Sequence, residues 1–265
     1  MTLSEAIFLR RSVRTYNGLK LDRDTLARLQ SVVDRLEPLF PDAPLPAVKI
    51  VDGRDVEGRM GTYGVITGAR LYMIMAVAPG VEAQVQAGYM FEQLILAATA
   101  ANLGTCWLGG TFRRSRFAEA MGDCGDREVE IVSPVGHGTP KRRLSERLLR
   151  HSCRADHRRA FGFMFRTVDR KGHVDPDSPV GRALQAVRMA PSSSNSQPWR
   201  ATVDERPDGS TVVAFRCTRD RRRFTPTDMG IAYCHFVVSL RDQGIHFTID
   251  ASGGPLALRF TVGSR

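Results

Sequence analysis

The spacing of apolar residues divides the first part of the chain into helices and a strand. A short amphipathic segment from Leu3 to Leu9 opens the chain, and Ser4 can cap it as a first helix. Asp22 can cap a second helix, from about Arg23 to Leu36, whose apolar residues share one face (Leu26, Leu29, Val33 and Leu36). A proline-rich link follows, and Ala47 to Val51 then reads as a short strand.

The remaining pattern predicts both strands and helices. A long helix from about Glu82 to Leu103 ends before Gly104, which is a natural C-terminal cap. The segment Asp228 to Gln243 repeats its design weakly, with an apolar face, a glycine near each end and a strand afterwards. Further helices are expected at Ser115 to Met121 and Val180 to Met189, and further strands at Leu71 to Ala78, Val129 to Val135, Arg200 to Asp204, Thr211 to Arg216 and Leu256 to Val262.

The segment from Arg188 to Arg200 fits neither a helix nor a strand. Three serines, an asparagine and a glutamine lie between Pro191 and Pro198, which restrict the backbone. The amides of Asn195 and Gln197 each carry a donor and an acceptor, as the pyrimidine rim of a flavin requires. An ordinary turn that satisfies its own backbone is the alternative interpretation.

Composition sets limits on the class of protein. A chain of 265 residues with 42% hydrophobic content can bury a sizeable core. No run of eighteen apolar residues occurs and the N-terminus lacks a long apolar stretch, so we expect neither a membrane span nor a secretory signal. The five scattered cysteines form no disulfide framework. These features favour a cytoplasmic protein.

The net charge of +10 raises the question of a nucleic-acid partner. Only four of the 38 basic residues are lysines and the arginines are spread along the chain, so we predict no nucleic-acid binding, although a basic surface can attract anionic cofactors. His151, Cys153 and His157 have a spacing that could hold a metal ion, but no nearby residue completes a four-ligand set. We therefore predict no metal site.

Two motifs carry a family resemblance. Arg10-Arg11-Ser12-Val13-Arg14-Thr15-Tyr16 and the run from Ala190 to Trp199 together resemble the hallmark motifs of the FMN-dependent nitroreductase family. Their separation in the chain resembles the branch in which two nitroreductase-like halves are fused. The resemblance implies an α+β fold with a mixed, mainly antiparallel sheet flanked by helices. It further implies two pseudo-symmetric halves, residues 1–149 and 150–265, packed into one compact unit.

The resemblance also implies which residues bind the cofactor. In the first half, Gly109 would place an amide near the redox nitrogen of the flavin, and Lys141 and Arg143 would meet its phosphate; a plain Gly-Gly turn and a solvated basic loop are the alternatives. The faint echo of the arginine motif at Arg150 to Arg154 lacks a partner loop, so we expect one flavin site per chain. The full expected set is Arg10, Arg11, Ser12, Arg14, Leu108, Gly109, Lys141, Arg143, Pro191, Ser192, Ser193, Asn195 and Gln197.

The implied activity is that of an FMN-dependent NAD(P)H oxidoreductase. NADH or NADPH would reduce FMN, and a nitroaromatic, a quinone or a similar small electrophile would accept the electrons. Because the flavin carries this chemistry, no side chain is expected to act as a catalytic residue. A flavin-binding protein that sequesters FMN without turnover is the alternative. Fusion of the halves makes a monomeric pseudo-dimer plausible, and a homodimer stays open.

Overall fold

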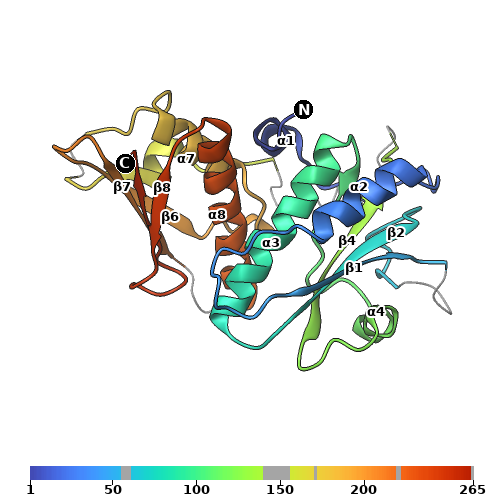
Figure 1. The fold of residues 1–265 in the computed structure, drawn as a ribbon. Helices are drawn as coiled ribbons and strands as arrows, with labels where there is room; N and C mark the ends of the chain where they lie inside the picture. The colour runs from blue at the N-terminus through green and yellow to red at the C-terminus, as the bar shows by residue number, and fades with distance from the viewer. Residues whose placement is uncertain (55–60, 140–155, 170–171, 219–221, 264–265) are drawn as a thin grey trace.

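The computed structural model describes residues 1–265 except 55–60, 140–155, 170–171, 219–221 and 264–265 (Figure 1). Its helices are α1 (Leu3–Leu9), α2 (Arg23–Val33), α3 (Val81–Ala100), α4 (Arg114–Met121), α6 (Phe161–Met164), α7 (Pro179–Met189), the 3₁₀ turn η1 (Ser193–Asn195) and α8 (Thr225–Asp242). Its strands are β1 (Ala47–Asp52), β2 (Leu71–Val77), β3 (Gly104–Thr105), β4 (Glu128–Gly136), β5 (Phe165–Thr167), β6 (Trp199–Glu205), β7 (Thr211–Cys217), β8 (Phe247–Asp250) and β9 (Arg259–Val262).

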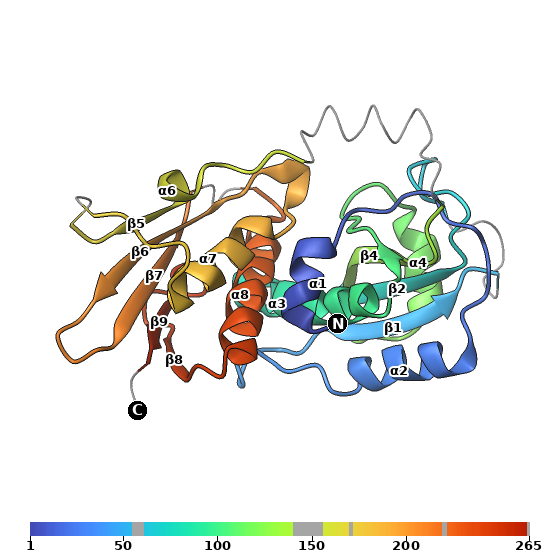
Figure 2. The ribbon, with the colours of Figure 1, turned by 90° about the horizontal axis from the view of Figure 1, so that it is seen from above.

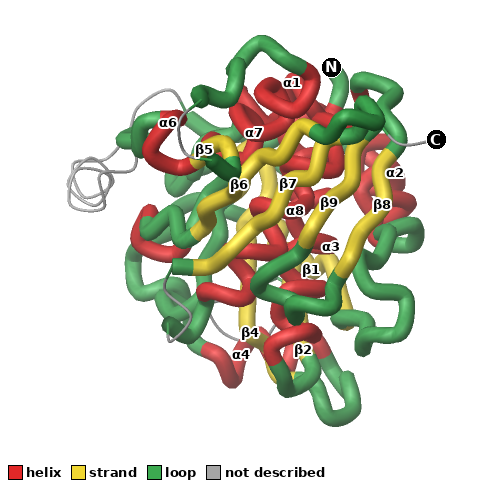
Figure 3. Tube along the Cα trace, turned by 90° about the vertical axis from the view of Figure 1, so that its left-hand side faces the viewer, coloured by secondary structure: helices red, strands yellow, loops and turns green. Residues whose placement is uncertain are grey.

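The strands form two separate sheets. The N-terminal sheet has the order β1-β2-β4-β3 and is antiparallel throughout. The C-terminal sheet has the order β5-β6-β7-β9-β8, and only its β5–β6 pair is parallel (Figure 3). The α+β class and the mainly antiparallel pairing are thus confirmed. The sequence pattern did not indicate that the strands would divide between two sheets.

The two sheets are covered differently. All seven residues of β2 are buried, because α2 and α3 cover one face of its sheet and α4 covers the other (Figure 1). Tyr72 of β2 meets Phe117 of α4 edge to face, with ring centroids 5.4 Å apart. Burial along β6 instead alternates, with Trp199, Ala201 and Val203 facing the core under α7 and α8. Continuous and alternating apolar patterns are what two-sided and one-sided coverage require.

Helices α3 and α8 cross at the centre of the molecule (Figure 2). A Cβ atom on Gly88 would lie 2.2 Å from the carbonyl oxygen of Thr227, and one on Gly230 would lie 2.0 Å from that of Val85. The two contacts are therefore equivalent. Each glycine packs against the backbone of the other helix, at the residue that lies three positions before the glycine of that helix. Each sheet keeps a core of its own, and α3 contributes buried residues to both, Tyr89 to the C-terminal core and Phe91 to the N-terminal one.

Several local expectations are corrected by the structure. Thr2, not Ser4, caps α1. Its hydroxyl accepts from the backbone N–H of Glu5, and the Glu5 carboxylate accepts from the backbone N–H of Thr2. Helix α2 ends at Val33 and α3 at Ala100. Asn102, with φ of 59°, takes the left-handed position after α3 that we assigned to Gly104. Gly104 instead begins β3, where the side chain of Val13 packs against it.

The sequence predicts neither a metal site nor a membrane-spanning helix, and both points can be examined in the described residues. No group of His, Cys, Asp and Glu within them has the arrangement of a metal site, and His151 and Cys153 of the proposed cluster lie outside them. Among the helices that the structure describes, none combines the length and the apolar character that crossing a membrane requires.

Candidate functional site

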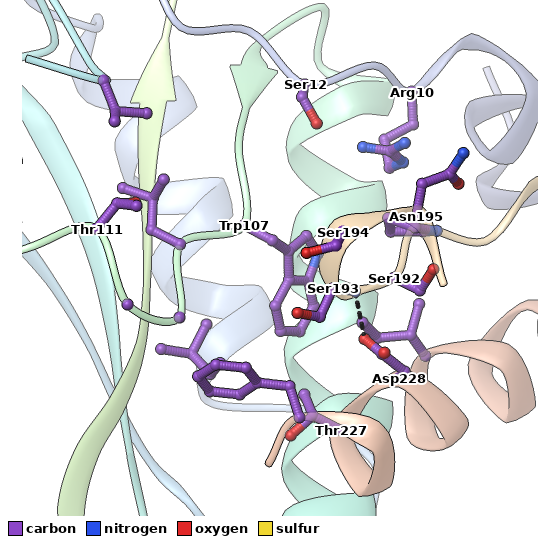
Figure 4. Close-up of a pocket in the computed structure, with 18 of the residues that line it drawn as sticks. Arg10, Ser12, Trp107, Thr111, Ser192, Ser193, Ser194, Asn195, Thr227 and Asp228 are labelled. Carbon is purple, nitrogen blue, oxygen red and sulfur yellow. Dashed lines mark hydrogen bonds between the residues drawn. The ribbon is translucent and has the colours of Figure 1, made fainter. Parts of the chain in front are cut away.

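A cavity of about 290 Å³ lies between the N-terminal and C-terminal parts of the molecule. Figure 4 shows side chains from both parts around it. The N-terminal wall consists of Arg10, Ser12, Arg14, Val65, Ile131 and the run Trp107 to Thr111. The C-terminal wall consists of Arg158, Pro191, Ser192, Ser193, Ser194, Asn195, Phe224, Thr227, Asp228 and Ile231. The cavity is at the lower end of the size range for small-molecule sites.

The segment after α1, residues 10–16, forms an extended arm along the edge of β3. The N–H of Val13 donates to the carbonyl of Thr105 at 2.8 Å, and the N–H of Thr67 donates to the carbonyl of Arg14 at 2.9 Å. In an extended segment alternate side chains point to opposite sides. Arg10, Ser12 and Arg14 therefore share the pocket side of the arm.

Arg14 carries the clearest electrostatic signal in the pocket. Its Nε and Nη1 atoms are buried, and no hydrogen-bond acceptor for them exists among the described residues. Buried guanidinium nitrogens without acceptors are costly, because they lose hydration and gain no hydrogen bond in return. An anion in the pocket would supply the acceptors. The neighbouring Arg11 is exposed and lies outside the pocket wall.

The serine loop, residues 191–197, closes the opposite side in a strained conformation. Ser194, Asn195 and Gln197 all have φ near 50°, the left-handed region that residues with side chains seldom adopt. The carboxylate of Asp228 holds the loop: it accepts from the N–H of Ser193 at 2.9 Å and from the hydroxyl of Ser196 at 3.3 Å. The first of these bonds is dashed in Figure 4. Strain of this kind is typical of functional loops.

Asp228 is almost fully buried at the first turn of α8. Burial raises the pKa of this carboxyl from 3.8 to about 7, and the bonds from Ser193 and Ser196 and the charge of Arg222 offset only part of that effect. Because the charged form is disfavoured by loss of water, a substantial fraction is protonated near neutral pH. The pocket therefore contains an acid that changes charge in the physiological range.

The turn after β3 presents backbone to the pocket. Leu108 is fixed by two backbone bonds with Val132, at 2.9 and 3.0 Å. A Cβ atom on Gly109 would lie 2.6 Å from the ring of Phe224, whereas one on Gly110 would meet nothing within 4 Å. A side chain at position 109 would therefore displace the ring of Phe224, a constraint that the sequence alone did not indicate.

The family is decided by the sequence match. A protein-family model described as "Putative TM nitroreductase" matches residues 2–240. The chain belongs to the nitroreductase family. Family membership supports an oxidoreductase of nitroreductase type. No curated protein matches the sequence.

Solved structures with the nitroreductase fold are similar to this chain at low identity. A "putative nitroreductase" from Thermotoga maritima has a TM-score of 0.62 and 20% identity, and the match covers 99% of this chain and 94% of that one. A nitroreductase with bound FMN from Bacteroides fragilis has a TM-score of 0.43 and 17% identity, covering 54% and 92% of the two chains. The FMN-dependent nitroreductase NfnB from Mycobacterium smegmatis, in complex with NADPH, has a TM-score of 0.42 and 14% identity, covering 54% and 96%.

Most of the site residues expected from the sequence of this nitroreductase lie together. The pocket is lined by Arg10, Ser12, Arg14, Leu108, Gly109, Pro191, Ser192, Ser193 and Asn195. Lys141 and Arg143 lie outside the described residues. Gln197 is turned away from the pocket, because its side chain accepts from the N–H of Arg159 at 2.9 Å and donates to the carbonyl of His157 at 3.2 Å. Arg11 faces away on the alternate side of the arm.

Sequence reasoning missed other residues of the pocket wall. Arg158 donates to the side-chain oxygen of Asn195 at 3.3 Å, and Trp107, Phe224 and Asp228 line the cavity. The sequence carries no signal for Asp228, because an acidic residue in the first turn of a helix is common and complements the helix dipole. Nothing in the sequence singles out Arg158 among the many arginines of this chain.

Proposed function

We propose that this pocket binds FMN, and that the protein is an FMN-dependent NAD(P)H oxidoreductase that reduces nitroaromatic, quinone or similar electrophilic small molecules. The observation that carries the proposal is the pair of buried nitrogens of Arg14 that have no hydrogen-bond acceptor among the described residues, in a cavity whose other wall includes the serine loop. Family membership supports the same conclusion.

The arm is suited to the phosphate end of the cofactor. Arg10 and Arg14 present guanidinium groups, which bind phosphate oxygens through paired, charge-assisted hydrogen bonds. Ser12 lies between them in the arm and adds a hydroxyl for the phosphate or the ribityl chain. Lys141 and Arg143 belong to the proposal as further phosphate ligands. Each bond to a charged group contributes roughly 1.5–3 kcal/mol, so two arginines can hold a non-covalent cofactor.

The rest of the pocket is suited to a flat heteroaromatic ring. Trp107 offers an indole, and Gly109 and Gly110 leave backbone accessible. Asn195 also lines the cavity, where its amide donates to the carbonyl of His157 at 2.9 Å and accepts from Arg158 at 3.3 Å. When bound, FMN would supply the redox chemistry, taking a hydride from NADH or NADPH and passing two electrons to the acceptor. The chain itself would orient the ring and limit water at one face. No nucleophilic side chain is needed.

We also propose that residues 1–149 and 150–265 are pseudo-equivalent halves with one flavin site between them. Support comes from α3 and α8, which correspond at one constant offset in the sequence. Gly88 corresponds to Gly230 at the crossing, and Asn102 to Gly244, both left-handed, after the helix. The backbone bond from Leu103 to Ala98 recurs from Ile245 to Leu240. The correspondence supports a monomer that works as a pseudo-dimer, with a homodimer as the alternative, and we place this protein in the cytoplasm as part of the same proposal.

The absorption spectrum of the purified protein, with and without added FMN, tests the cofactor directly. Flavin absorbance that survives gel filtration, and bleaches anaerobically with NADH or NADPH, is expected. Oxidation of the reduced protein by a quinone or a nitro compound would complete the cycle. A protein that binds FMN but is bleached by neither nucleotide would be a flavin-binding protein without turnover. A protein that does not bind FMN at all would contradict the proposal.

A further inference from the structure

A buried chain of hydrogen bonds connects the two central helices to the pocket. Glu92 of α3 and His235 of α8 are both fully buried, and their Oε1 and Nε2 atoms lie 2.9 Å apart. The other carboxylate oxygen of Glu92 accepts from the indole N–H of Trp107 at 2.8 Å. The Nδ1 atom of His235 lies 2.9 Å from the carbonyl oxygen of Ala186 in α7. The chain thus runs from α7 through both helices to the pocket wall.

The hydrogen-bonding groups on either side of His235 determine how many protons the His235–Glu92 pair holds. The carbonyl of Ala186 can only accept, so Nδ1 of His235 carries a proton. The contact between Nε2 of His235 and Glu92 needs one further proton, which sits either on the imidazole or on the carboxyl group. Both arrangements leave the pair neutral overall and every polar atom of it bonded. A fully satisfied network of this kind restricts its members to a single geometry.

Stability alone does not account for such a pair. Two ionisable groups in a dry interior are often no more stabilising than apolar residues of similar size, because their desolvation cost offsets their attraction. The end of the chain at Trp107 suggests a different role. This indole packs edge to face on Phe91, with ring centroids 5.1 Å apart. It also packs against the core of the N-terminal sheet and against that of the C-terminal sheet. Its remaining exposed part lines the pocket.

The second tryptophan shows that an indole in this protein does not need such a partner. Trp199 is fully buried, and its Nε1 atom has no hydrogen-bond partner among the described residues. It is held by packing in the core, and it does not line the pocket. Trp107 is only partly buried and lines the pocket, so the hydrogen bond that its indole N–H donates to the buried carboxylate of Glu92 can fix its orientation there.

We propose that Glu92 and His235 are positioning residues that hold the Trp107 indole as a fixed wall for the ring of the bound cofactor. The network joins α3 to α8, so the packing between the two helices would set the orientation of this wall. The identity of the ring as a flavin rests on the proposed function. The positioning of the indole does not, and it can be measured without any ligand.

The first test follows the indole N–H of Trp107 by nitrogen-15 NMR in the ligand-free protein, with Trp199→Phe to assign the signal. Glu92→Met should move this resonance and speed its exchange with water. Glu92→Gln should preserve it, because the amide can accept from Trp107 and donate to a neutral His235. Gln86→Met is the matched control, since Gln86 is equally buried in α3 but bonds the backbone of Leu39 and Phe40. An unchanged Trp107 signal in Glu92→Met would overturn the proposal.

The second test measures FMN affinity by quenching of flavin fluorescence. Glu92→Met should weaken binding about tenfold, the equivalent of one charge-assisted bond, and Glu92→Gln should restore it. In a Trp107→Phe background, which removes the same hydrogen bond from its other end, Glu92→Met should have no further effect on affinity. Equal FMN affinity of the wild type and Glu92→Met, or full additivity in the Trp107→Phe background, would contradict the positioning role.

The two tests separate the two proposals. If the wild type does not bind FMN, the proposed function fails, and the ligand-free signal of Trp107 still decides whether Glu92 positions the indole. If the wild type binds FMN and Glu92→Met binds it equally well, the positioning role fails while the proposed function stands. If Glu92→Met does not fold, Trp107→Phe and Glu92→Gln still report on the same bond.

Discussion

Helices α3 and α8 use the same device with different results. Two residues before each crossing glycine, a buried polar side chain holds the loop that follows the preceding helix. In α3 this residue is Gln86, whose amide bonds the backbone of Leu39 and Phe40. In α8 it is Asp228, whose carboxylate bonds Ser193 and Ser196. The two parts of the molecule thus share a plan for attaching a loop to a central helix.

The loops differ in what they present. After α2, Leu39, Phe40 and Ala43 turn inward and join the core, and no residue from 34 to 46 has a positive φ. After α7, Ser194 and Asn195 adopt the left-handed conformation and line the pocket. The comparison teaches that the backbone plan alone does not make a site. An apolar loop closes the first position, while hydroxyls, amides and a carboxylate keep the second one open to a ligand.

The largest expected effect concerns the charge that distinguishes Asp228 from Gln86. Asp228→Asn can still accept from the N–H of Ser193 and can donate to the hydroxyl of Ser196, but it cannot ionise. Since the pKa of Asp228 is raised from 3.8 to about 7, the folded wild type binds the proton more tightly than the unfolded chain between these values. The contribution of Asp228 to stability should therefore be greatest below pH 4 and be lost as pH rises to 7, so that over this range the wild type loses up to about 4 kcal/mol relative to Asp228→Asn.

Urea unfolding of both proteins at several pH values measures this difference. The exposed Asp242 near the end of the same helix offers a control, since Asp242→Asn should keep the wild-type pH dependence. Parallel stability curves for the wild type and Asp228→Asn between pH 4 and 7 would contradict this prediction. They would mean that ionisation of Asp228 does not affect the attachment of the serine loop, just as Gln86, which cannot ionise, holds the loop after α2.

The shared crossing of α3 and α8 predicts the next largest effect. Gly88→Ala and Gly230→Ala should each lower the free energy of unfolding by about 2–3 kcal/mol, because the new Cβ atom meets a backbone carbonyl of the other helix at close to 2 Å. Gly162→Ala is the control, since its Cβ atom would meet nothing within 4 Å. Thermal and urea unfolding measure the losses. A large loss of unfolding free energy in only one of the two variants would mean that α3 and α8 do not contribute equivalently to the crossing.

The third prediction concerns the arm, residues 10–16, on the pocket wall opposite the serine loop, and it compares two arginines of this arm. Arg14→Met should weaken FMN binding by about 2 kcal/mol, or roughly 30-fold, because it removes a charge-assisted bond to the phosphate. Arg11→Met changes the net charge equally, but this residue is exposed and outside the pocket, so its affinity should stay near that of the wild type. Equal losses in both variants would mean that the arm attracts anions only through its overall charge.

The smallest expected effect comes from strain in the serine loop. Ser194→Gly should raise the free energy of unfolding by about 0.5 kcal/mol, since relief of the left-handed conformation exceeds the entropy that glycine loses on folding. Asp42→Gly in the corresponding first loop should have the opposite sign, because no positive φ exists there to relieve. FMN affinity of Ser194→Gly should fall slightly as the loop loosens. Destabilisation by Ser194→Gly would show that the side chain itself holds the loop.

The amino-acid sequence by itself determined most of the elements, though not α6 or β5, and two of the site's components. Apolar periodicity placed α3, α8 and β2 to within a few residues, because burial of one face or of a whole strand is written into consecutive positions. The serine loop was recognisable from its composition, since prolines, serines and amides act over short distances, and the arm was recognised by its resemblance to a family motif. Helix ends were predicted less well: Thr2 and Asn102 replaced Ser4 and Gly104, because several neighbouring residues can serve as caps.

Only the tertiary structure decided which of these residues meet. Gln197 has the same amide chemistry as Asn195, yet it bonds Arg159 and His157 and does not reach the pocket. Asp228 and the chain from Trp107 through Glu92 to His235 depend on the crossing of two helices far apart in the sequence. The reason is physical. A local pattern records how much of a segment is buried, whereas hydrogen-bond partners and raised pKa values arise only when distant segments exclude water together.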